Sequence, residues 1–154
     1  MAPSLDFNLK VFAAKAISTA TTTLSDFSVD QQAAKRHSEN GEPIGFSIFP
    51  TSLVIDSNET YEFQVVQADD GALTTNKEVI GTSGALTGTQ VQAIANQNGQ
   101  VFVGINPNVL TREFIGLQVV TVVNSGAISI TIDAYLGMQS LASQVQFPAA
   151  NYTP

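Results

Sequence analysis

The feature that most constrains the fold is a pair of strand-like segments, residues 114–123 and 127–135, separated by Asn124–Gly126. The second segment alternates apolar and polar residues with a period of two, as a strand with one buried face does. The first segment is almost entirely apolar, which predicts burial on both faces. One face should meet a core, and the other should lie beneath a second sheet, a terminal arm or a partner subunit. We therefore expect a β-hairpin here.

Further strand-like segments recur along the chain at intervals of roughly ten residues, as in all-β sandwiches. Residues 90–97 are compatible with a helix, but the following Asn98-Gly99 is a hairpin signal that would make them a strand instead. No alternation of strands with long helices occurs. We predict an all-β fold, an antiparallel jelly-roll-like β-sandwich of about eight strands with extended N- and C-terminal arms. The other expected strands cover residues 16–27, 43–49 (ended by Pro50), 60–67 (with Tyr61, Phe63 and Val65 on one face), 78–82 and 100–105.

The expected organisation is an N-terminal arm (1–15), one sandwich domain (16–135) and a C-terminal tail (136–154). Fully extended, the two ends would reach about 50 and 60 Å, farther than the roughly 40 Å width of such a domain. Apolar residues on such ends need a burial partner. They would pack either on a neighbouring subunit or on their own sandwich. The candidate partner-binding residues are Phe7, Val11, Phe12, Phe147 and Tyr152.

Composition excludes several classes of protein. The 154 residues contain no Cys, which removes disulfides and thiolate chemistry. Six Lys and Arg against thirteen Asp and Glu give a net charge of -7, and the only adjacent basic pair is Lys35-Arg36. We therefore expect binding neither to nucleic acid nor to anionic membranes. No apolar run is long enough to cross a bilayer, and no leader precedes the first strand, so we expect synthesis in the cytoplasm.

His37 is the only residue that could supply an imidazole base. Ser38 and Asp30 lie near it in sequence, but neighbouring residues of a polar loop do not form a triad, so a solvated loop residue is the better interpretation. The turn signal at residues 69–71, with Asp69 and Asp70, could offer two oxygens to Ca²⁺. It lacks the other ligands that this ion requires, and a plain turn is expected.

A further acidic group could suggest a glycosidase. It consists of Asp56, Glu59 and Glu62, and paired carboxylates hydrolyse glycosides. The chain has no Trp to stack on a sugar ring, so a solvated strand edge is favoured. The glycines at 81, 84 and 88 resemble a phosphate loop but lack its lysine and its strand-to-helix setting. We expect no enzyme activity, no cofactor and no metal.

A set of short features follows one another along the chain. They are Leu5-Asp6-Phe7, the Thr-rich segment 16–22, Ser25-Asp26-Phe27, the strand start Gly41-Glu42-Pro43-Ile44, the strand 61–67, Val79–Ser83 and the final pair of strands. Their order resembles the Bbp16-like capsid cement (decoration) proteins of tailed bacteriophages. The resemblance covers about residues 5–136. The opening motif of the family pattern reads Lys15-Ala16-Ile17-Ser18 in this chain, and the tail after Met138 is longer than that pattern.

The resemblance implies a jelly-roll sandwich that binds the outside of an icosahedral head. Its implied partners are the major capsid protein, whose neighbouring subunits it bridges, and itself, as a homodimer or alternatively a trimer. Its implied location is the capsid exterior of the virion, and it implies no catalytic residues. The alternative hypothesis is a phage receptor-binding or carbohydrate-binding β-sandwich module.

Overall fold

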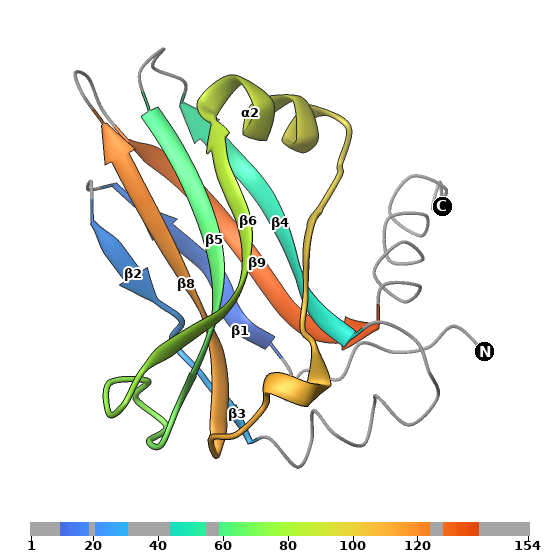
Figure 1. Ribbon diagram of the computed structural model, residues 1–154. Helices are drawn as coiled ribbons and strands as arrows, with labels where there is room; N and C mark the ends of the chain where they lie inside the picture. The colour runs from blue at the N-terminus through green and yellow to red at the C-terminus, as the bar shows by residue number, and fades with distance from the viewer. Residues whose placement is uncertain (1–9, 19–20, 31–43, 55–58, 124–127, 139–154) are drawn as a thin grey trace.

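The computed structural model describes residues 10–18, 21–30, 44–54, 59–123 and 128–138. Two antiparallel sheets face one another (Figure 1). The predicted all-β sandwich is confirmed. Sheet A has the order β1 (Lys10–Ile17), β9 (Ser129–Met138), β4 (Ile44–Val54) and β7 (Val101–Gly104). Sheet B has the order β2 (Thr22–Leu24), β8 (Phe114–Val123), β5 (Glu59–Ala68) and β6 (Glu78–Thr87), and β3 (Val29–Asp30) also pairs with β8.

The strand order is that of a jelly roll. β2 and β3 pair with successive stretches of β8, so together they act as one interrupted strand. With β2 and β3 taken as one strand, four strand pairs are nested along the chain: β1 with β9, β2 with β8, β4 with β7 and β5 with β6. This nesting folds a long antiparallel ribbon into two facing sheets, which is the double Greek key of jelly rolls.

Strand alternation builds the core between the sheets. Tyr61, Phe63 and Val65 of β5 point inward, as the sequence predicted, and they belong to one buried cluster with Phe46 and Ile48 of β4. Full burial of each such side chain contributes roughly 1.5–3 kcal/mol. This shared core holds the two sheets together.

The expected hairpin between β8 and β9 is wrong. β8 pairs with β5 along its whole length, from Glu59 opposite Val123 to Ala68 opposite Phe114, whereas β9 pairs with β1 and β4 in the other sheet. Residues 124–127 lie outside the described residues. The alternation of side chains defines a strand and its faces but not the strand beside it, and the pairing here runs across the sandwich.

The predicted burial of both faces of β8 is confirmed for the first half of the strand. Its outer face is covered there by the connection between β5 and β6. Leu73, in the connection between β5 and β6, is 1% exposed and lies over Gly116. It forms a small second core with Val66 and Ala68, on the outer side of sheet B. Farther along β8, Val122 is 50% exposed. The expected cover by an arm or a partner is therefore not needed for the first half of the strand.

The expected boundaries at residues 15 and 136 both fall inside strands. β1 begins at Lys10, and its residues Val11 and Phe12 are 0% exposed. β9 continues to Met138, with Leu136 also buried. Among the described residues, the sandwich thus extends from residue 10 to residue 138.

Pro50 was expected to end its strand, but the strand continues past it. β4 continues to Val54 through an irregularity between Pro50 and Ser52. β7 pairs only with Gly45–Ile48, so Pro50 lies beyond the point where its missing N–H would have faced that neighbour. A bulge beside a free edge is a position that proline tolerates within a sheet.

The helix alternative for residues 90–97 is correct. α2 (Gly88–Asn96) starts with a capping box, in which the Thr87 hydroxyl accepts from the Gln90 backbone and the Gln90 side chain accepts from the Thr87 backbone. The Asn98-Gly99 pair ends the helix, with the Gly99 N–H donating to the Ile94 carbonyl. α2 covers one end of the sandwich (Figure 1). No helix in the described part of the chain is long and apolar enough for a membrane crossing.

We predict that Gly116→Ala destabilises the domain by about 1–3 kcal/mol, because the new methyl group would overlap Leu73 Cδ1 in a packed site. The matched control is Gly137→Ala in β9, where an added Cβ meets no atom of the described residues within 4 Å. Urea unfolding of both variants measures the difference. Equal stability of the two variants would show that Leu73 does not pack on Gly116.

Candidate functional site

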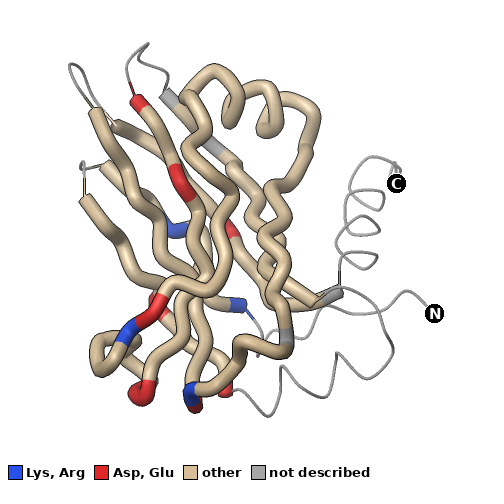
Figure 2. The backbone as a smooth tube through the Cα atoms, in the orientation of Figure 1, with Lys and Arg blue, Asp and Glu red and all other residues tan. Residues whose placement is uncertain are grey.

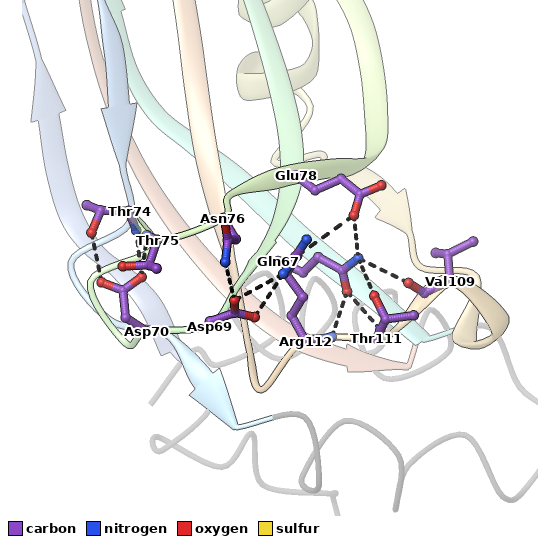
Figure 3. Close-up of polar contacts among 10 residues, drawn as sticks. All are labelled: Gln67, Asp69, Asp70, Thr74, Thr75, Asn76, Glu78, Val109, Thr111 and Arg112. Carbon is purple, nitrogen blue, oxygen red and sulfur yellow. Dashed lines mark hydrogen bonds and ion pairs between the residues drawn. The ribbon is translucent and has the colours of Figure 1, made fainter.

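A buried glutamine organises the end of the sandwich that carries the β5–β6 turn (Figure 3). Gln67 is 1% exposed. Its Oε1 accepts from the backbone N–H of Thr111 at 3.0 Å, and its Nε2 donates to Glu78 Oε2 at 3.0 Å and to the Val109 carbonyl at 3.1 Å. Arg112 adds an ion pair to Asp69 at 2.9 Å. These bonds fasten the segment before β8 to the end of β5, so the cluster has a structural role.

The turn predicted at Asp69–Gly71 is confirmed. Asp70 Oδ1 accepts from the backbone N–H groups of Thr75 at 2.7 Å and Thr74 at 2.9 Å. These bonds lower the pKa of the Asp70 carboxyl below its ordinary value, the Thr75 bond most. The described residues contain no group of three or more potential metal-ligating side chains. The carboxylates at this turn are therefore engaged in shaping the chain.

We predict that Asp70→Asn makes stability less dependent on pH below about 4, near the unfolded pKa of aspartate. A folded pKa below the unfolded one stabilises the fold above the unfolded pKa, and this contribution is lost as the pH falls through the folded pKa. Unfolding midpoints measured from pH 2.5 to 7 test this for both proteins. Parallel profiles would contradict the role of Asp70.

The carboxylates Glu59 and Glu62 are not a catalytic pair. They lie on opposite faces of β5: Glu59 is buried beside Gly88 at the start of α2, and Glu62 faces outward. Hydrogen bonds from Gln64 and Thr82 lower the pKa of Glu62. Burial raises the pKa of Tyr61 to about 12, and the charge of Glu59 adds to this effect. Asp56 lies outside the described residues.

The other candidates for chemistry do not assemble either. His37 and Ser38 lie outside the described residues, and Asp30 is an exposed residue of β3. Gly81 and Gly84 are strand residues of β6, and Gly88 begins α2, so they form no phosphate loop.

Of the five candidate partner-binding residues, two are placed. Val11 and Phe12 are core residues of β1, so they pack on their own sandwich, which was the alternative to contact with a neighbouring subunit. Their alternation continues from the N-terminal segment without a break, which is why the sequence did not separate arm from strand. Phe7, Phe147 and Tyr152 lie outside the described residues.

The outer surface of sheet A is the most distinctive surface of the described residues. We call it the sheet A face. Phe102 of β7 and Tyr135 of β9 flank Ser47 of β4 in register, and Lys10 of β1 is opposite Tyr135. It comprises the outward residues Lys10, Gly45, Ser47, Phe49, Phe102, Gly104, Asp133, Tyr135 and Gly137.

Aromatic contacts dominate this face. The rings of Phe49 and Tyr135 meet edge to face with centroids 6.1 Å apart, and Lys10 Nζ lies 5.1 Å from the centre of the Tyr135 ring. Lys10 also pairs with Asp133 at 2.6 Å, and this bond raises the pKa of Lys10. The two charges on the face thus neutralise each other. The signal in the sequence for this face was that β4 carries aromatic residues on both of its faces, Phe46 on one and Phe49 on the other.

Charge is distributed unevenly over the molecule (Figure 2). Many of the coloured residues gather at the turn end. Segments 69–78 and 112–113 of the sequence contribute Asp69, Asp70, Lys77, Glu78, Arg112 and Glu113. The opposite end carries α2, which has no charged residue, and the buried Glu59. Among the described residues, charge is therefore concentrated at the turn end and sparse at the end that carries α2.

In comparisons with known proteins, no protein-family model and no curated protein matches the chain.

Proposed function

We propose that this protein is a structural component of a phage head, a capsid cement protein that binds the outer surface of the icosahedral shell. In this role it bridges neighbouring major capsid protein subunits and acts as a homo-oligomer. The coarser class, an all-β sandwich, is observed. The cement role is a proposal that rests on the resemblance in the order of sequence features.

The observation that carries the proposal is the position of the two ends of the described sandwich, Lys10 in β1 and Met138 in β9. The first and last strands are neighbours, with Lys10 opposite Tyr135. The segments before residue 10 and after residue 138 therefore leave the same region of sheet A. Sixteen residues, 139–154, reach about 55 Å when extended. Two segments that start from neighbouring strand ends of one domain are suited to gripping adjacent subunits.

Charge and chemistry support the same proposal. A net charge of -7 repels nucleic acid, which suits a protein on the outside of a DNA-filled shell. In the described part of the chain, the polar clusters around Gln67 and Asp70 hold the fold together. A cement protein needs this rigidity and needs no reacting group.

The carbohydrate-binding alternative is less well supported. Sugar-binding sandwiches present a free aromatic ring face to the ligand. Here Lys10 Nζ lies over the ring of Tyr135, and the rings of Tyr135 and Phe49 meet edge to face. This alternative predicts specific binding on a glycan array, which the cement proposal does not.

We predict that the full chain co-sediments with expanded empty capsids built from the major capsid protein of the same genome. A variant ending at Met138 should bind them at least tenfold more weakly, because it lacks one of the two segments. Met138 is the right end point, since β9 and its pairs with Ile44 and Gly45 stay complete. Unchanged thermal unfolding of the variant is the control.

Two outcomes would contradict the proposal in different ways. No binding by the full chain would reject the cement function itself. Equal binding by the full chain and the shortened variant would keep the function but reject the role of residues 139–154.

A further inference from the structure

The side of the sandwich where β1 is the edge strand presents exposed apolar side chains. Phe27, between β2 and β3, is 61% exposed, more than any other large hydrophobic residue in the described part of the chain. Ala13, Ala14 and Ala16 of β1 are also exposed. We call these four residues the β1 edge patch. A single exposed apolar residue is ordinary on a protein surface, whereas a contiguous group marks a contact site.

Two contacts place Phe27 beside the alanines. The Phe27 N–H donates to the Val11 carbonyl at 3.3 Å, and Lys15 Nζ pairs with Asp26 Oδ1 at 2.5 Å. The chain at Phe27 therefore follows β1 along the stretch that holds the first two alanines. The patch is thus contiguous.

The backbone that carries Phe27 is fixed on both sides. The Ser25 N–H donates to the Leu117 carbonyl at 2.7 Å, and Ser25 Oγ accepts from the Leu117 N–H at 3.2 Å. Phe27 is therefore held between β8 of sheet B and β1 of sheet A. A side chain on a fixed backbone loses less conformational freedom when it binds. Aromatic residues presented in this way dominate the energetics of many contacts between proteins.

The irregularity of β1 decides what kind of contact is possible at this side. The register with β9 shifts between Phe12 and Lys15, and Ala14 has a φ of 47°. Such a bulge interrupts the regular row of backbone groups that an added strand would need. Contact at this side is therefore made by side chains, not by a further strand of the sheet.

The charges on β1 are balanced. Lys15 pairs with Asp26, and Lys10 pairs with Asp133 at 2.6 Å. Two of the four Lys and Arg residues that the structure describes thus lie on this one strand, although the whole chain has a net charge of -7. Copies of an acidic protein repel one another, and least where the facing surfaces carry balanced charges. The β1 edge is therefore a place where two copies can approach.

We propose that the β1 edge patch joins two copies of this chain around a two-fold axis. The patch is self-complementary, because it has an exposed ring at one end and small side chains at the other. If the axis lies between Ala13 and Ala14 and the two β1 strands are antiparallel, position 11 of one copy lies opposite position 16 of the other. The Phe27 ring, beside position 11, then packs on Ala16 of the second copy, and the two-fold axis repeats this contact.

The size of this side fits a reversible dimer. β1 has eight residues and is about 26 Å long, and the two sheets lie about 10 Å apart. A side of these dimensions buries several hundred Å² per copy, at the low end for specific complexes. We therefore expect a dimer that dissociates on dilution. The inference rests on the homo-oligomer in the proposed function and not on capsid binding, so the two can fail separately.

The test is sedimentation equilibrium of the full chain at increasing concentration, where we expect an equilibrium between monomer and dimer. Phe27→Ser should weaken the dimer at least tenfold, as truncation of a central aromatic contact does. The matched control is Val122→Ser, which changes a residue that is 50% exposed on the outer face of sheet B. It should leave the dimer unchanged. Unchanged thermal unfolding shows that both variants fold.

Ala16→Glu tests the other half of the contact. Ala16 is exposed in the single chain, so the variant should fold as the parent does. In the dimer the new carboxylate would be covered by the Phe27 ring of the second copy without a partner of its own, which is costly. We expect the dimer to weaken by at least tenfold here as well.

Several results would overturn the inference. The full chain may sediment as a monomer at every concentration, or as a dimer that neither variant weakens. A dimer weakened by Phe27→Ser but not by Ala16→Glu would reject the register, and a trimer or an open-ended series would reject the two-fold axis. A monomer whose Phe27→Ser variant loses capsid binding would assign the patch to the shell protein instead.

Discussion

β9 lies between β1 and β4 and pairs antiparallel with both, and the rest of the sandwich follows from that register. Ile130, Ile132 and Leu136 meet the core, so Tyr135 and Gly137 necessarily face outward. A slip of one residue would exchange these two sets and expose the core side chains. The same register also joins the first described strand to the last, which places Lys10, at the start of β1, opposite Tyr135 near the end of β9.

Two buried polar side chains differ in how far their hydrogen-bonding groups are satisfied. Gln67 has both its oxygen and its nitrogen engaged, and it locks the segment before β8. Ser47 is similarly buried but its hydroxyl has no partner among the described residues. A satisfied polar group rigidifies its surroundings, whereas an unsatisfied one favours any partner that can bond it. This contrast distinguishes the turn end, where polar side chains hold the fold, from the sheet A face, where a buried hydroxyl has no partner among the described residues.

Several local features were correctly predicted because local chemistry decides them. The alternation of Tyr61, Phe63 and Val65 indicated β5, and the turn at Asp69–Gly71 followed from side chains that bond their own backbone. The ambiguous segment after Thr87 became a helix because its capping box satisfies the first backbone N–H groups. The sheet A face was not predicted, since Ser47 and Tyr135 are 88 positions apart and meet only through strand pairing.

The sequence by itself determined that the chain forms short antiparallel strands, which residues of β5 point inward, and that the molecule is acidic and without thiols. Only the tertiary structure decided which strands are neighbours, that β8 and β9 belong to opposite sheets, and that Val11 and Phe12 are core residues. The physical reason is that side-chain alternation specifies the faces of a strand, whereas the hydrogen bonds between strands join backbone groups common to every residue. The choice of neighbour therefore depends on how all the inward faces pack at once.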